Sequence, residues 1–289
     1  MREPSARYKE PSARYKEPSA WNKKPSTKPP FLEAGWRTIF LARGLVDFAA
    51  WWELTKDPHA ATLIDDPNIR YGGESRVYRV ALDDSQGRQC TLYVKCQLDQ
   101  WRRTWRRPLR GEPTVCAEFR ALQWCLAKGI PVARPLFFDS AKGADGRRYT
   151  VLVSLGLDGF HSLADCDIAA LDATRRRRLM ADVAQTLAFM HGCRYIHRNL
   201  YPKHVFVAWR PALQRFDVRF IDLEKARPVL HERACFRDLE TLGRRTLGVD
   251  IRDQLRFLRH YLGHARLDGK GKLLARRLAA AIRLRPLVK

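Results

Sequence analysis

The chain has 289 residues, 45% of them hydrophobic, which is enough for one large domain or a two-lobed one with a sizeable core. Its net charge of +23 indicates an anionic partner, and composition alone leaves nucleic acid, an acidic membrane face and a phosphorylated substrate open. The seven cysteines are scattered and include no Cys-x-x-Cys pair, which excludes the common zinc and dithiol redox motifs and favours a reducing cytoplasm.

Residues 1–33 are predicted to form a disordered, basic tail. The heptad Glu-Pro-Ser-Ala-Arg-Tyr-Lys is repeated there, but each copy contains proline and lacks two apolar seam positions, which excludes a coiled coil. The polar, proline-rich start differs from a signal peptide, and no apolar run approaches the roughly 20 residues of a membrane-spanning helix. We therefore expect the protein to remain inside the cell without crossing a bilayer.

Residues 34–66 are predicted to form a helical extension, because apolar side chains recur there at the spacing of one or two short amphipathic helices. Residues 67–154 are predicted to form a small β-rich lobe with one main helix. Its expected elements are a hairpin of strands 75–82 and 91–98, a helix at 114–128, and strands near 134–138 and 149–155.

Residues 155–289 are predicted to form a larger, helical lobe. Its expected elements are helices near 173–193, 235–247, 250–263 and 271–284, and strands at 205–209 and 217–223. A β-rich lobe with one helix, followed by a helical lobe that carries a loop and two short strands, is the order of a protein-kinase-like fold. We therefore predict the α+β class with a two-lobed, protein-kinase-like architecture.

A glycine pair is the first candidate for chemistry. Phosphoryl transfer requires a protein mainly to position nucleotide, metal and acceptor. Gly72 and Gly73, followed by Ser75, lie before the strand 75–82, where backbone amides can approach phosphates. A Gly-Gly turn is also common in ordinary hairpins, so this motif alone has a structural explanation.

Lys95 lies within the strand 91–98, where a lysine either faces solvent or grips phosphates with the help of a carboxylate. Glu118, in the middle of the helix predicted at 114–128, supplies that carboxylate. Glu112 competes for the role, although its position before Pro113 suits a helix start better.

The segment His197-Arg198-Asn199 is similar to the His-Arg-Asp of a kinase catalytic loop, with Asn in place of Asp. In that loop a metal-binding Asn follows five residues later, and here His204 occupies the position. Asp222 follows a strand, as does the second metal ligand of a kinase. Either residue alone has an ordinary structural explanation, but their order after the lysine strand and the glutamate helix favours a phosphotransferase site.

Together these motifs resemble the lipopolysaccharide kinase family of Gram-negative bacteria, the InaA-like and core-heptose kinases. The resemblance covers about residues 35–265. It rests on Gly-Gly-Glu-Ser-Arg-Val-Tyr-Arg at 72–79, Tyr-Val-Lys-Cys-Gln at 93–97, Glu-Phe-Arg-Ala-Leu at 118–122, Leu-Tyr-Pro-Lys-His at 200–204 and Arg-Asp-Leu-Glu-Thr-Leu-Gly-Arg-Arg at 237–245.

The resemblance implies ATP and Mg²⁺ as cofactors, and phosphate transfer to a sugar hydroxyl of a lipid-linked core oligosaccharide. It implies that the nucleotide is bound by Gly72, Gly73, Ser75, Lys95 and Glu118, that the metal is bound by His204 and Asp222, and that catalysis involves Asn199, Asp222, Lys95 and Arg198. It further implies that Asp238 lies in a helix that anchors the catalytic loop.

Asn199 is the position where this chain departs from the best-studied members of the family, which carry Asp there. An amide can accept a hydrogen bond from the acceptor hydroxyl but cannot take its proton, and general-base help is worth about 100- to 10,000-fold. A slow kinase, a kinase whose base lies elsewhere, and a pseudokinase or regulatory nucleotide-binding protein all stay open. A nucleic-acid-binding protein is a further alternative, but no recognisable nucleic-acid module accompanies the charge.

The stretch Trp-Arg-Arg-Thr-Trp-Arg-Arg-Pro-Leu-Arg, residues 101–110, interleaves tryptophan with arginine. It is either a solvated basic loop or an element that docks on an anionic membrane, where each basic residue contributes on the order of 1 kcal/mol and tryptophan favours the interfacial layer. The basic runs 175–178 and 272–289 either add to such a surface or form ordinary exposed faces. With a lipid-linked acceptor, we expect a cytoplasmic protein that is peripheral at the inner membrane.

Overall fold

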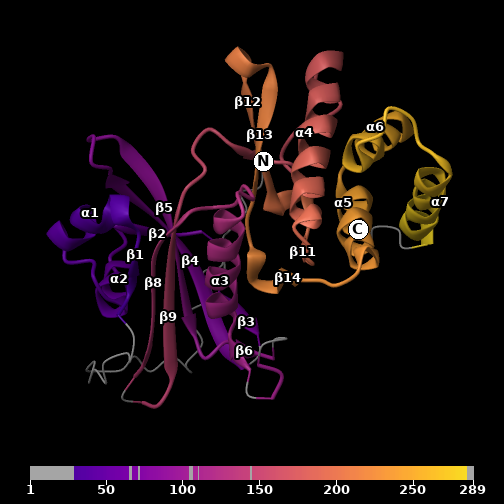
Figure 1. Ribbon diagram of the computed structural model, residues 1–289. Helices are drawn as coiled ribbons and strands as arrows, with labels where there is room; N and C mark the ends of the chain where they lie inside the picture. The colour runs from indigo at the N-terminus through magenta and orange to yellow at the C-terminus, as the bar shows by residue number, and fades with distance from the viewer. Residues whose placement is uncertain are drawn as a thin grey trace, which may run out of the picture.

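The computed structural model describes residues 29–64, 67–70, 72–103, 107–109, 111–143 and 145–284. The repeated N-terminal heptads lie outside these ranges. Figure 1 shows a sheet-rich N-terminal lobe on the left and a helical C-terminal lobe on the right. Within the described ranges, none of the helices combines the length and the apolar character needed to cross a bilayer.

The N-lobe is built on a seven-stranded sheet in which every pairing is antiparallel. Its strands are β1 (Phe31–Leu32), β2 (Ala61–Leu63), β3 (Asn68–Arg70), β4 (Gly73–Asp83), β5 (Gln89–Leu98), β8 (Pro135–Lys142) and β9 (Arg148–Leu155). They run in the order β1-β8-β9-β5-β4-β2, and β3 also pairs with β4. Because side chains alternate along β5, Val94 and Cys96 enter one core layer while Lys95 and Gln97 face α3.

Helices cover both faces of this sheet (Figure 1). They are α1 (Arg37–Ala42), α2 (Phe48–Leu54) and α3 (Thr114–Ala127), the last preceded by a short ladder of β6 (Trp101–Arg102) with β7 (Glu112–Pro113). On one face Trp51 of α2 is fully buried against Phe40 and Phe137. On the other, Phe119 of α3 stacks on Phe138 with ring centroids 4.2 Å apart. Phe137 and Phe138 are neighbours in β8, so they point to opposite faces.

The C-lobe packs around a second core, to which the buried face of α3 also contributes. Its elements are β10 (His161–Ser162), α4 (Ala173–Gly192), β11 (Tyr195–Ile196), β12 (Val205–Arg210), β13 (Arg215–Phe220), β14 (Arg227–Pro228), α5 (Phe236–Arg245), α6 (Ile251–Leu262) and α7 (Gly269–Leu284). The lobes meet where Val132, just before β8, bridges to Phe220, and the Ala133 N–H donates to the Phe220 carbonyl at 3.1 Å. Asp222 lies two residues after Phe220. This contact therefore fixes the position of the N-lobe relative to the Asp222 carboxylate.

All elements that the sequence predicts are present, and the described ranges contain eight additional strands: β1, β2, β3, β6, β7, β10, β11 and β14. The sequence did not reveal these strands, because runs of two or three residues are too short to show a strand period. β1 lies within the predicted tail 1–33 and pairs with β8, and β2 lies within the predicted extension 34–66 and pairs with β4. The sheet thus recruits residues from both segments that precede the predicted lobe.

Candidate active site

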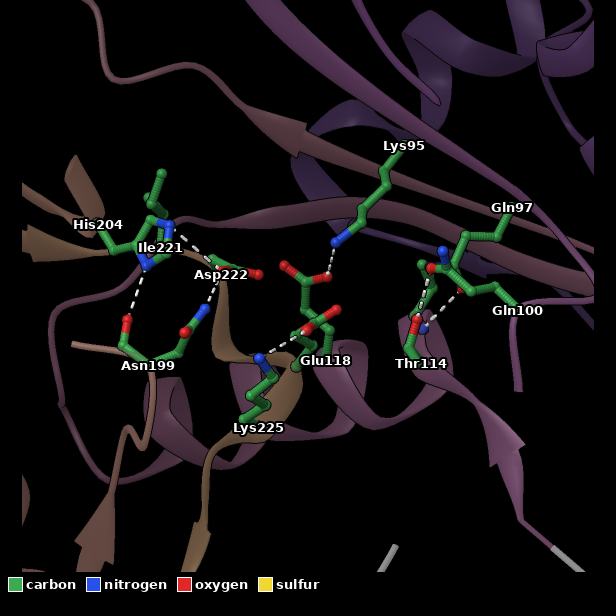
Figure 2. Close-up of polar contacts among 12 residues, drawn as sticks. Lys95, Gln97, Gln100, Thr114, Glu118, Asn199, His204, Ile221, Asp222 and Lys225 are labelled. Carbon is green, nitrogen blue, oxygen red and sulfur yellow. Dashed lines mark hydrogen bonds and ion pairs between the residues drawn. The ribbon is translucent and has the colours of Figure 1, made fainter. Parts of the chain in front are cut away.

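The centre of the site is an ion pair between β5 and α3. Lys95 Nζ donates to Glu118 Oε2 at 2.7 Å, and the two side chains are only 20% and 9% exposed (Figure 2). The competing Glu112 pairs instead with Arg120. The expected pairing of Lys95 with Glu118 is therefore present, and the alternative with Glu112 is wrong.

A buried polar cluster holds α3 against β5. Gln97 Nε2 donates to Gln100 Oε1 and to Thr114 Oγ1, each at 2.5 Å, and Gln97 Oε1 accepts from the Val115 N–H at 3.0 Å (Figure 2). The residue before α3 supplies no side-chain cap, so Gln97 satisfies one of the free backbone donors of the first turn. Gln97 lies in the motif at 93–97, but the sequence alone assigns it no role, since its partners lie in other elements.

Three carboxylates act on the charge of Lys95. Burial disfavours that charge, but Glu118, Asp222 and Glu224 outweigh burial and raise the pKa of Lys95 above its ordinary value. Burial raises the pKa of Glu118 as well, with Lys95 opposing the rise and Asp222 and Glu224 adding to it. Asp222 and Glu224 follow β13 of the C-lobe, so the charge of Lys95 is balanced from both lobes.

Asp238 of α5 holds the loop that contains His197, Arg198 and Asn199. Its Oδ2 accepts from the His197 N–H and its Oδ1 from the Arg198 N–H, each at 2.7 Å, and the residue is 1% exposed. Burial lowers the pKa of His197, whose neutral ring donates from Nε2 to the Ile221 carbonyl at 2.9 Å. The helix that anchors the loop is therefore the one that the resemblance implies.

The carboxylate of Asp222 lies next to two side chains of this loop. Asn199 Nδ2 donates to Asp222 Oδ2 at 2.6 Å, and His204 Nε2 lies 3.4 Å from the same oxygen (Figure 2). His204 Nδ1 lies 2.7 Å from the Asn199 carbonyl, which can only accept, so this nitrogen carries the proton. Burial lowers the pKa of His204 despite the attraction of Asp222. The neutral ring therefore turns the lone pair of Nε2 toward Asp222.

This arrangement fits a divalent cation. An imidazole lone pair and a carboxylate oxygen face each other without a hydrogen atom between them, and a cation satisfies both. Mg²⁺ commonly uses one or two protein carboxylates together with phosphates and water, so few protein ligands suffice. No group of three His, Cys, Asp or Glu side chains in the described part of the chain is placed to hold a metal. His204 and Asp222 thus fit a metal that a nucleotide also ligates.

Two residues of the site have unusual backbone conformations. Arg198 and Asp222 lie in the left-handed region, with φ of 64° and 59°. A non-glycine residue in such a region costs about 1–3 kcal/mol and persists only where the surroundings impose it. Here the surroundings are the carboxylate of Asp238 for Arg198 and the contacts of Asn199 and His204 for Asp222.

The glycine motif divides into a turn and a strand. Gly72 has a φ of 78° and open space beside it, which suits a turn that phosphates can approach. Gly73 is the first residue of β4 rather than part of the turn, and a side chain there would collide with the backbone of Asp99 and Gln100. Ser75 lies in the same strand with 6% of its surface exposed. Only Gly72 therefore occupies the position expected for the pair.

The stretch 101–110 is partly strand rather than loop. Trp101 and Arg102 form β6, and Arg102 donates to the Glu224 carbonyl just beyond Asp222. The exposed residues of this stretch are Arg103, Arg107, Pro108 and Leu109. Trp105, Arg106 and Arg110 lie outside the described residues.

A family model described as the lipopolysaccharide kinase (Kdo/WaaP) family matches residues 50–261. The chain belongs to this family. The solved structure "WaaP in complex with acyl carrier protein" is similar in fold, with a TM-score of 0.58 and 18% identity over 89% of this chain and 96% of that one. No curated protein matches the chain in sequence.

Membership of the lipopolysaccharide kinase family confirms the predicted family resemblance, and the similar structure confirms the predicted two-lobed kinase-like fold. Family membership assigns the protein to the lipopolysaccharide kinases. The matched residues contain the whole site, from the Gly72 turn to Asp238.

Loss of the Asp238 carboxylate is expected to destabilise the protein, because Asp238→Ala leaves two buried N–H groups without acceptors. Each such group costs about 1–3 kcal/mol. Asp238→Asn, which keeps one acceptor oxygen, is the matched control and should fall between the variant and the wild type. Urea unfolding measures the free energies; equal midpoints for wild type and Asp238→Ala would show that the carboxylate does not hold the loop.

Proposed function

We propose that the protein transfers the γ-phosphate of ATP to a sugar hydroxyl of the lipopolysaccharide inner core. The observation that carries this proposal is the convergence of Lys95, Glu118, Asn199, His204 and Asp222 from both lobes on one site. Kinases need a phosphate-gripping lysine paired with a helix carboxylate, and a metal-binding Asp after the catalytic loop. The Lys95–Glu118 pair and Asp222 are the residues that we propose for these two roles.

In the proposed mechanism Lys95 holds the phosphates while Glu118 keeps its ammonium group in place. The open turn at Gly72 offers backbone amides to the same phosphates. His204 and Asp222 would hold Mg²⁺, which when bound neutralises phosphate charge. Because the transition state is loose, positioning and electrostatics carry most of the rate, and little proton transfer is needed early.

The side chain of Asn199 has a defined contact in the structure, which is with Asp222. Its amide donates to Asp222 Oδ2, so it orients that carboxylate and leaves its charge intact. Its amide oxygen is then the group that can accept a hydrogen bond from the acceptor hydroxyl. We therefore propose a working kinase that positions the acceptor without a carboxylate base.

Nucleotide binding is expected to depend on both Lys95 and Asp222. Lys95→Ala and Asp222→Ala should each weaken binding of a non-hydrolysable Mg-ATP analogue at least about tenfold, since charge-assisted hydrogen bonds contribute about 1.5–3 kcal/mol. Lys128→Ala, an exposed lysine at the end of α3, is the matched control. Titration calorimetry measures the affinity, and unchanged affinity in both site variants would overturn the nucleotide-site assignment.

Restoring a carboxylate at Asn199 is expected to have two effects. Without Mg²⁺, Asn199→Asp should lower the melting temperature, because two carboxylates then lie within hydrogen-bonding distance. With saturating Mg²⁺, turnover should rise at least about tenfold with little change in ATP affinity, since a general base is regained. Asn199→Ala, which removes the amide without adding charge, should show neither effect, and its turnover should fall.

The outcomes of this comparison separate the alternatives. If neither the wild type nor Asn199→Asp phosphorylates any core acceptor, the pseudokinase alternative is favoured. A loss of turnover in Asn199→Asp at saturating Mg²⁺ would show that the amide contact with Asp222 is required for catalysis.

We also propose that the β6–β7 connection docks on the cytoplasmic face of the inner membrane. Leu109 in this connection is 87% exposed and lies close in sequence to the exposed Arg103 and Arg107. An apolar side chain among basic ones suits the interface of an anionic bilayer. A lipid-linked acceptor would lie on the same surface.

The double variant Arg107→Ser, Leu109→Ser is expected to bind vesicles of anionic lipid less well than wild type, and raised salt should mimic part of the loss. Leu213→Ser is the matched control, because Leu213 is 67% exposed on the opposite lobe. Co-sedimentation measures the bound fraction. Equal binding by the double variant and the wild type would show that this connection is an ordinary solvated loop.

The structural neighbour was solved with an acyl carrier protein, and the C-lobe of this chain offers an apolar cavity of about 110 Å³. Side chains of α4, α5, α6 and α7 line it, among them Leu242, Leu258, Leu278 and Ala279. Because an acyl chain is apolar, we propose as a second partner an acyl carrier protein whose chain enters this cavity.

An acyl-loaded carrier protein is expected to raise the melting temperature, whereas an unloaded carrier should raise it less. Ala279→Trp fills the cavity and should abolish the difference. Ala280→Trp places the same ring on the exposed side of α7 and is the matched control. Equal shifts with loaded and unloaded carrier would exclude the cavity as the acyl site.

A further inference from the structure

A second cavity of about 260 Å³ lies between the lobes, on a different face of α3 from Glu118. We call it the interlobe basic pocket. Its described lining contains six basic side chains, of which three come from the N-lobe and three from the C-lobe: Arg102, Arg103, Arg120, Arg198, Lys225 and Arg227. Neither the nucleotide site nor the loop contacts described above account for this concentration of charge.

The charges of the pocket are poorly balanced. Glu112 is the single carboxylate in the described lining, and it pairs with Arg120. Lys225 lies 3.9 Å from Glu224, outside the pocket. Within the described ranges, the other four guanidinium groups have no carboxylate within 4 Å. Cations from two lobes therefore repel one another across the pocket.

Two arginines that line the pocket each have a buried donor without an acceptor in the described part of the chain. The Nε atoms of Arg102 and Arg227 are buried and lack a hydrogen-bond partner among the described residues. A buried, unsatisfied donor is costly, and more so when it is charged. Arg198 experiences the same field, since burial and the charges of Arg227, Arg237 and Arg102 lower its pKa, with Asp238 opposing them. A single anion in the pocket would relieve the repulsion.

We propose that the interlobe basic pocket binds a phosphate group, held by Arg102 of the N-lobe and by Arg198 and Arg227 of the C-lobe. Guanidinium groups in such a cluster match phosphate oxygens in charge and geometry. The wall of the pocket includes Trp124 and Tyr195, whose rings stack 4.2 Å apart and provide a flat apolar surface beside the charges. A phosphate on a saccharide and free phosphate share the required chemistry.

Phosphate binding here would join parts of the site that belong to different lobes. Arg198 precedes Asn199 in the catalytic loop, and Arg102 already donates to the Glu224 carbonyl beyond Asp222. An anion shared by Arg102, Arg198 and Arg227 therefore fixes the loop relative to β6 of the N-lobe. The pocket is distinct from the Lys95 site, so its occupation does not compete with the nucleotide for the same groups.

Direct binding of inorganic phosphate, measured by titration calorimetry without nucleotide, tests the proposal independently of kinase activity. Arg102→Gln and Arg227→Gln should each weaken binding at least about tenfold, because each loses a charge-assisted hydrogen bond. Lys95→Ala should leave binding intact, as should Arg215→Gln, an exposed arginine on β13 that serves as the matched control. Arg103→Gln removes a further positive charge from the lining at an exposed position, so it should also weaken binding, and it keeps the test valid if a more buried variant fails to fold.

Retention of phosphate binding in Arg102→Gln, Arg103→Gln and Arg227→Gln would overturn the proposal, as would its loss in Lys95→Ala alone. Kinetics then separate the two sources of phosphate, an arm that rests on the proposed function. If the acceptor saccharide supplies the phosphate, inorganic phosphate inhibits competitively and Arg227→Gln raises the acceptor KM. If free phosphate is the ligand, it raises turnover in wild type and not in Arg227→Gln.

Discussion

The charge of Lys95, largely buried between the lobes, is the constraint on which the site depends. A lysine there must be balanced, and the balance comes from Glu118 on α3 together with Asp222 and Glu224 after β13. The charges of these residues thus link β5, α3 and the C-lobe segment that follows β13. Gln97 serves the same end, since it ties the start of α3 to β5 and so keeps Glu118 within reach of Lys95.

The catalytic loop is held in a strained shape by buried polar contacts. Asp238 takes two backbone N–H groups, and its burial makes their loss expensive. These two hydrogen bonds impose the left-handed backbone conformation of Arg198. In this conformation the preceding residue, His197, faces Asp238, and the following residue, Asn199, faces Asp222. Strain at this point is consistent with a loop that must present a metal ligand and an acceptor-binding amide side by side.

Much of this arrangement could be predicted from the sequence. The order of the lysine strand, the glutamate helix, the His-Arg-Asn loop and Asp222 gave the two-lobed architecture, because each part has a local pattern and a fixed place in the chain. The choice of Glu118 over Glu112 followed from helix position alone. Predictions failed where the pattern was too short, as for β1–β3, or where Gly73 looked like part of a turn and is packed strand.

Other features depend on contacts between distant residues and have no local pattern. The amide of Asn199 could be placed in the loop, but its bond to Asp222 requires two elements 23 residues apart to meet. The proton on Nδ1 of His204 follows only from the carbonyl that it contacts. Likewise, Arg102 and Arg227 are ordinary basic residues in sequence, and their unsatisfied donors appear only once the lobes close around them.

The central claim is that this site transfers phosphate to lipopolysaccharide although Asn199 replaces the usual Asp. The most direct measurement incubates the purified protein with Mg²⁺, γ-labelled ATP and truncated core lipopolysaccharides, and identifies the labelled product by mass spectrometry. The expected result is a phosphate ester on a core sugar that is absent when Lys95→Ala replaces the wild type. ATP binding of normal strength without label on any core acceptor would contradict the claim.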